Sequence, residues 1–197
     1  MDEDRMAGAG ANLAAPGEAG LKGIHHSAFR CRDAEETRAF YEDILGLPLA
    51  AALAFEEEPG SGKPHPYVHI FFALPDGNFI AFFDAPDSAT ERHFRPAHGF
   101  DRHIAFEAGS EAELMAWKAK LDAAGVPCFG PIDHHFVRSI YMWDPNGLQV
   151  EITARVREHD AILAKEAANA RAVLAEWTER TAGRKAALKA PAASAAA

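Results

Sequence analysis

Three residues have the types and the spacing of a metal centre: two histidines, His26 and His103, and one glutamate, Glu151. His26 opens the tetrapeptide His-Ser-Ala-Phe and His103 opens His-Ile-Ala-Phe, so the two occupy equivalent positions in a weak internal repeat. Glu151 lies in the run 148–153, where apolar and polar residues alternate as in a half-buried strand. Two imidazoles and one carboxylate on one sheet face form a triad suited to Fe(II) or Mn(II), with Zn(II) or Ni(II) as alternatives.

Each of the three residues also has a simpler interpretation. A single histidine in a strand is more often a hydrogen-bonded core residue than a metal ligand. Glu151 could pair with Arg30 or Arg138 instead of a metal. The metal interpretation therefore depends on finding all three together at repeat-equivalent strand positions.

The elements that must position these residues follow the same repeat. A helical pattern follows each histidine strand, at 34–45 and at 111–124, and each pattern ends at a glycine, Gly46 or Gly125. Three strand-like runs come after each helix. These runs are 49–55, 67–74 and 79–84 in the first unit, and 127–129, 139–143 and 148–153 in the second.

The sequence therefore predicts an α+β fold in which two βαβββ modules form a concave, partly open mixed sheet, plus a C-terminal helix. We expect a domain at 22–154, with modules at about 22–85 and 100–154, and a helix at 155–183. The apolar stripe of that helix either packs on its own domain or forms a homodimer contact. Residues 1–21 and 184–197 are expected to be disordered.

Composition limits the partners. The formal net charge is −9 and no basic stripe occurs, which argues against binding to nucleic acid or to a membrane surface and favours a small-molecule substrate. No signal peptide and no apolar run long enough to span a membrane are present, so we expect a cytoplasmic protein. Cys31 and Cys128 match neither a metal pair nor a disulfide framework.

Two segments resemble a known superfamily. Residues 24–33, Ile-His-His-Ser-Ala-Phe-Arg-Cys-Arg-Asp, resemble the opening of vicinal-oxygen-chelate proteins, and residues 139–151 resemble their closing motif. This group comprises glyoxalase I, extradiol dioxygenases, fosfomycin-resistance transferases, methylmalonyl-CoA epimerase and bleomycin-binding proteins. The resemblance covers about residues 22–154. It implies that His26, not His25, is the first metal ligand, and that His25 points toward the helices.

Departures from the family pattern narrow the expected reaction. Aligning Gly77 with Gly147 places Ala81 where glyoxalase I and the epimerase have a fourth protein ligand, which favours the three-ligand branch. Tyr141 matches a tyrosine of the extradiol enzymes. His134 lies near their acid/base histidine, although the register is off by one residue.

One further departure is unfavourable for ring cleavage. Asn78 stands where a catalytic histidine is expected, which leaves His69 or His134 to transfer protons. The resemblance still favours an extradiol-like dioxygenase, a metal-dependent oxidoreductase acting on a small aromatic or enol substrate, with Tyr141 and His134 as catalytic residues. The alternatives are a glyoxalase I-like lyase or isomerase, a fosfomycin-type thiol transferase, or a non-catalytic drug-binding protein.

Overall fold

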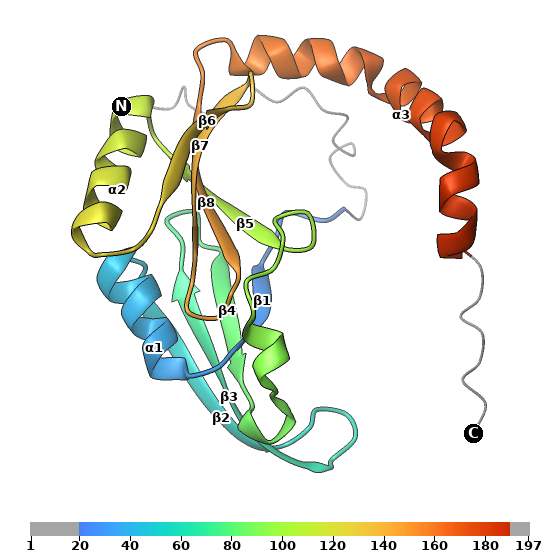
Figure 1. Ribbon diagram of the computed structural model, residues 1–197. Coiled ribbons are helices and arrows are strands. Elements are labelled where there is room, and N and C mark those ends of the chain that lie inside the picture. Colours follow the sequence, from blue (N-terminus) through green and yellow to red (C-terminus); the bar gives the residue numbers. More distant parts are fainter. Residues whose placement is uncertain (1–19, 190–197) are drawn as a thin grey trace. The chain divides into compact units, whose positions relative to one another are not determined.

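The computed structural model describes residues 20–189. These residues fall into two units, 20–156 and 157–189, which are described separately. The first unit contains both predicted modules, and the predicted α+β fold of two βαβββ modules is confirmed. The two sheets carry helices on one face, and α1 and α2 lie on the same side (Figure 1).

The first module forms a four-stranded sheet in the order β1-β4-β3-β2. β1 pairs with β4 in parallel, and the other pairs are antiparallel. Asp33 caps the helix that follows β1, because its Oδ1 accepts from the Glu36 N–H at 2.7 Å. The elements are β1 (His26–Cys31), α1 (Ala34–Arg38), the π-helical η1 (Ala39–Ile44), β2 (Leu49–Glu57), β3 (Pro64–Ala73) and β4 (Phe79–Asp84).

The second module repeats this arrangement with the strand order β5-β8-β7-β6. The parallel pair is β5 with β8, the counterpart of β1 with β4. One predicted strand is placed wrongly, since the run 127–129 is not β6 and only Phe129 belongs to it. The elements are β5 (His103–Ala108), α2 (Glu111–Ala123), β6 (Phe129–Asp133), β7 (Val137–Trp143) and β8 (Gln149–Arg155).

A buried polar network joins the two modules through the turn between β7 and β8. The Tyr41 hydroxyl donates to Asp144 Oδ2 at 3.0 Å, and the Asn146 amide donates to Thr37 Oγ1 at 3.2 Å. Asn146 Oδ1 also accepts from the Arg32 backbone N–H at 2.9 Å. Because all of these side chains except Arg32 are buried, the contacts hold the modules in a defined relation.

The linker between the modules contains two short 3-10 turns, η2 (Pro86–Ser88) and η3 (Glu91–Phe94). It packs closely on the same β7–β8 turn, since a Cβ on Gly147 would come within 2.6 Å of the Arg95 backbone. The Ala97 N–H donates to the Gly147 carbonyl, and the Trp143 indole donates to the Ala97 carbonyl. The linker therefore packs on the second module and is hydrogen-bonded to it.

The second unit consists of α3 (His159–Lys189), which begins later and ends later than the range 155–183 expected for it. Several large apolar side chains on it are exposed, among them Leu174 and Trp177. No helix within residues 20–189 is long and apolar enough to cross a membrane. The prediction of a disordered tail is wrong for residues 184–189, which form the last part of α3. Apart from residues 20–21, the other residues predicted to be disordered lie outside the described part of the chain.

Candidate metal centre

The carboxylate of Glu151 lies in the middle of the second sheet. Its neighbours across the sheet are Ala105 on β5 and Tyr141 on β7, all on one face because directly paired residues point the same way. Glu151 is only 8% exposed. Its Oε2 is 3.7 Å from His103 Nε2. Two ligands about 2.1 Å from one ion are roughly 3.0–3.4 Å apart at octahedral or tetrahedral angles, so a small approach of the two side chains would bring both to one ion.

His103 is oriented for this role by a backbone carbonyl. Its Nδ1 lies 2.7 Å from the carbonyl oxygen of Gly99, which can only accept a hydrogen bond. The proton of a neutral His103 therefore resides on Nδ1, and Nε2 faces Glu151 as a free lone pair. Metal-binding histidines are commonly held by such a second hydrogen bond.

Tyr141 and His134 form the adjacent part of the site. The Tyr141 hydroxyl is 2.7 Å from His134 Nε2, and the Phe129 ring stacks on Tyr141 at 5.1 Å. Burial, with a smaller contribution from Glu151, raises the pKa of Tyr141, so its hydroxyl stays protonated near neutral pH. The two predicted catalytic residues are thus in hydrogen-bond contact.

These residues line one pocket of about 700 Å³. Its wall is largely aromatic and aliphatic, with His103, His134, Tyr141 and Glu151 among its polar groups. None of the described lining residues is a lysine or an arginine. The lining consists of His98, Gly99, Phe100, His103, Phe129, Ile132, His134, Phe136, Val137, Tyr141, Trp143, Gln149 and Glu151.

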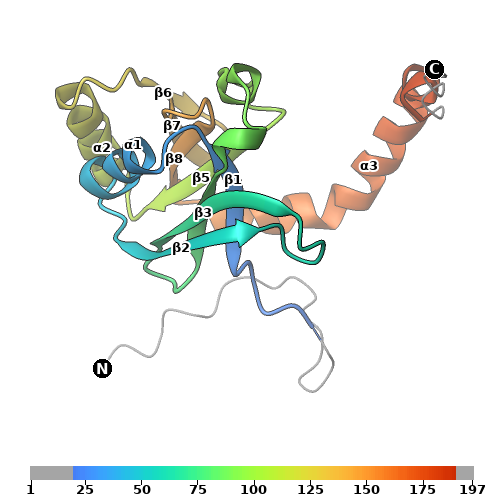
Figure 2. The same cartoon turned by 90° about the horizontal axis from the view of Figure 1, so that it is seen from below.

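His26 lies on the first module, at the start of β1. β1 and β5, the strands that begin with the two histidines, belong to separate sheets (Figures 1 and 2) and do not pair with each other. His26 is exposed, and its Nδ1 is 2.9 Å from Nδ1 of His25. The prediction that His25 points toward the helices is wrong, because His25 contacts His26 and the Phe79 ring instead.

The position of the fourth ligand in related enzymes is occupied by alanine. Ala81 pairs with Ala28 in the first module as Glu151 pairs with Ala105 in the second, which supports the alignment made from the sequence. His69 is close by, with its ring 6.2 Å from that of His26. Its Nε2 is buried and has no hydrogen-bond partner within residues 20–189, and burial lowers its pKa, which favours the neutral ring at neutral pH.

The alternative partners proposed for Glu151 are occupied elsewhere. Arg138 pairs with Glu111, and Arg30 donates to the Ala85 carbonyl and to Ser88. Glu151 is therefore a nearly buried carboxylate whose one ion-pair contact in the described part of the chain is His103. An oxygen donor and a nitrogen donor, both turned toward a pocket, fit a divalent ion.

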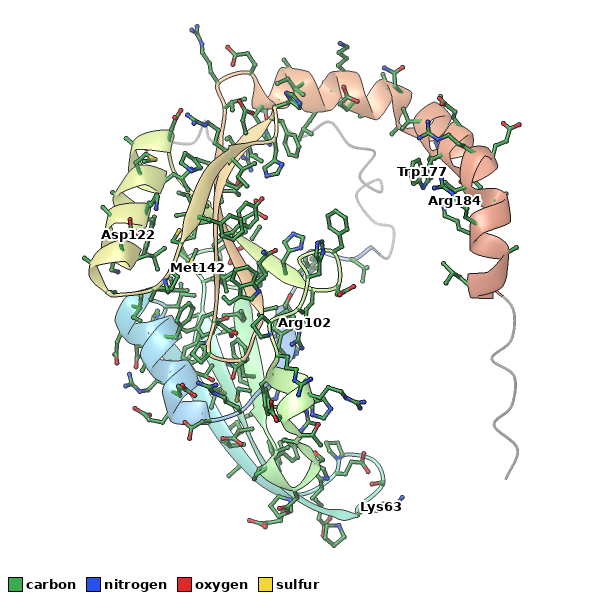
Figure 3. All side chains as sticks on the ribbon, in the orientation of Figure 1. Lys63, Arg102, Asp122, Met142, Trp177 and Arg184 are labelled. Atoms are coloured by element: carbon green, nitrogen blue, oxygen red, sulfur yellow. The ribbon has the colours of Figure 1, made fainter. Side chains whose placement is uncertain are left out.

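The structure brings together four of the five predicted site residues, His103, His134, Tyr141 and Glu151, around one pocket. His26 lies on β1 in the other sheet, and within residues 20–189 no three potential ligands already form a metal-sized cluster. Figure 3 draws the side chains and labels Arg102, the residue directly before β5. The contact between His25 and His26 and the Gly99 anchor were not foreseen from the sequence.

Comparison with known proteins agrees with this fold. The profile of the Glyoxalase/Bleomycin resistance protein/Dioxygenase superfamily matches residues 23–152. The uncharacterised protein YwkD of Bacillus subtilis is 38% identical over 90 residues, which cover 46% of this chain and 64% of that protein, just under two thirds of its length.

Solved structures with the same fold include enzymes of different reaction types. A glyoxalase/dioxygenase from Nostoc punctiforme is 27% identical with a TM-score of 0.54, covering 75% of this chain and 99% of that one. A mutant of the fosfomycin resistance protein FosX from Listeria monocytogenes, complexed with Mn(II), is 23% identical with a TM-score of 0.50, covering 70% and 96%. The match to the family profile spans well over half of the chain, which therefore belongs to the Glyoxalase/Bleomycin resistance protein/Dioxygenase superfamily.

Proposed function

We propose that residues 22–154 form a metal-dependent enzyme in which His26, His103 and Glu151 hold one divalent ion, Fe(II) or Mn(II). The observation that supports this most is the approach of His103 Nε2 to Glu151 Oε2, at 3.7 Å, in the wall of an aromatic pocket. Such an ion supplies a Lewis acid for two adjacent substrate oxygens and a redox centre for dioxygen.

The favoured reaction is an extradiol-like oxidative cleavage of a small aromatic or enol substrate. The aromatic wall binds a flat ring and excludes water. Tyr141 keeps its proton and can donate a hydrogen bond to a substrate oxygen, while His134 accepts or returns a proton through the Tyr141 hydroxyl. Together they provide proton transfer on the side of the pocket nearest Glu151.

Two other reaction types use the same scaffold. A glyoxalase I-like lyase or isomerase would need a fourth protein ligand in the pattern of that family, and Ala81 does not supply one. A fosfomycin-type thiol transferase is compatible with three ligands, and the Mn(II) complex of FosX shows that a protein of this fold binds that ion. A protein that binds a drug without chemistry is the third alternative.

Purification without oxygen, metal analysis and a dioxygen-uptake screen against substituted catechols test the proposal. We expect about one ion per chain and stoichiometric dioxygen uptake with at least one catechol. The His103→Ala variant is the control and should take up none. Metal-dependent turnover without dioxygen uptake would refute the dioxygenase and favour the transferase or isomerase.

The homodimer and the cytoplasmic location expected from the sequence stay predictions. The exposed apolar side chains of α3 are the reason to examine the oligomeric state.

A further inference from the structure

A second polar cluster lies on the open face of the first module, away from the aromatic pocket. Arg30 is on β1 and points to the same face as His26, because the two are four residues apart in one strand. Its Nη1 donates to the Ala85 carbonyl at 3.1 Å and to Ser88 Oγ at 3.0 Å. His65 Nε2 is 3.2 Å from the same Ser88 hydroxyl.

Arg30 differs from several other arginines of the chain because it forms no ion pair within residues 20–189. Arg32, Arg138 and Arg155 each pair with a glutamate, as expected in a chain with a net charge of −9. Arg30 has no carboxylate partner anywhere in residues 20–189, although it is partly buried. A partly buried guanidinium without a carboxylate partner is suited to binding an anion of a ligand.

The geometry of the contacts indicates which kind of anion. Ala85 and Ser88 occupy only Nη1 of Arg30, so the edge formed by Nε and Nη2 is without a partner in the described part of the chain. That edge presents two parallel N–H groups, the arrangement that binds both oxygens of a carboxylate. Ser88, held by His65, fixes the other side of the guanidinium and is a positioning residue.

We propose that Arg30 binds a carboxylate on the substrate, so that the substrate is an elongated acid with two adjacent oxygens at one end and the carboxylate at the other. The Cα atoms of His26 and Arg30 are about 13 Å apart along an extended strand, which indicates the scale of the spacing between the two ends of the molecule. The aromatic pocket, whose described lining has no cation, receives the ring and not the acid.

This inference rests on the proposed metal function only for the oxygen-bearing end. The probe is 3-(3,4-dihydroxyphenyl)propionate compared with its methyl ester, which keeps the vicinal hydroxyls and loses the charge. Dissociation constants are measured by calorimetry for the metal-free and the Mn(II)-loaded protein. The variants are Arg30→Gln, the matched control Arg32→Gln from just beyond the end of the same strand, and His103→Ala.

The acid should bind the wild type and Arg32→Gln roughly 10 to 100 times more tightly than the ester does, the range of a charge-assisted bidentate contact. Arg30→Gln should bind acid and ester alike, and Ser88→Ala should retain part of the preference. Equal binding of acid and ester to the wild type, absence of binding of the acid, or a preference that survives Arg30→Gln would overturn the inference.

The same experiment tests the metal site separately, through the ratio of the ester's dissociation constants without and with Mn(II). Mn(II) should strengthen binding of the ester to the wild type and not to His103→Ala. If Mn(II) has no effect while the acid preference depends on Arg30, the carboxylate site stands and the metal function fails.

Discussion

The two modules have the same strand pairing and opposite chemistry on their open faces. Where the second module carries Glu151 beside Tyr141, the first carries Ala81 beside Phe71 in the equivalent register. The first module carries His26, the proposed third ligand, and further along β1 Arg30, which donates to Ala85 and Ser88. Under the proposed function, the acid-base groups and two of the three ligands lie in the second module, and His26 and the carboxylate-binding arginine lie in the first.

The turns between the last two strands differ as well. In the second module Asp144 and Asn146 are buried and bonded to the first module. The corresponding turn of the first module has Leu74 and Asp76 at these positions, and it borders a cavity of about 630 Å³ together with Trp117 on α2. The side chain of Leu74 cannot accept a hydrogen bond, so the turn of the first module has no counterpart at this position to the bond between Tyr41 and Asp144.

Removing the carboxylate of the second module should have the largest effect. Glu151→Ala should weaken Mn(II) binding by more than the roughly 10- to 100-fold that loss of an outer-shell partner causes, because a direct donor is lost. His25→Ala is the matched change in the first module and should retain the ion, with a loss of about tenfold at most since it removes a hydrogen bond to His26. Metal titration measures the Mn(II) affinity of both variants, with circular dichroism as a folding control. If His25→Ala loses as much Mn(II) affinity as Glu151→Ala, His25 and not His26 would be the ligand.

The tyrosine of the second module should control turnover. Tyr141→Phe removes the hydroxyl bonded to His134, and we expect turnover to fall by roughly one to three orders of magnitude while metal content is unchanged. Tyr67→Phe changes the same group in the first module, where the ring stacks on Phe55, and should leave turnover unaltered. Steady-state kinetics measures turnover in both variants. Unchanged turnover in Tyr141→Phe would show that Tyr141 has only a packing role.

The two turns provide the smallest contrast. Asp144→Ala leaves the buried Tyr41 hydroxyl without its acceptor and should lower the free energy of unfolding by about 1–3 kcal/mol. Asp76→Ala changes an exposed turn residue whose carboxylate bonds to Asn78, and it should cost under about 1 kcal/mol. Urea unfolding of both variants tests this, and similar costs would mean that the buried network does not join the modules.

The sequence predicted the repeat, the faces of the strands and the equivalence of Ala81 in the first module to Glu151 in the second. Strand parity and the fixed offset between the modules determine all three. The prediction from the sequence ended the strand of β6 at Phe129, before Gly130 and Pro131, whereas β6 is an edge strand and an edge strand tolerates proline. The contacts of His25 could not be predicted, since it precedes the strand and parity does not apply. The partners of Arg30 come from segments far along the chain, which no local pattern reveals.

The central claim is that one ion is shared by His26, His103 and Glu151, and an anomalous difference map from crystals grown with Mn(II) tests it most directly. The account predicts a single strong peak about 2.1 Å from a nitrogen of each histidine and an oxygen of the glutamate. A peak ligated by His25 or His69 in place of His26, or no peak beside His103 and Glu151, would contradict it.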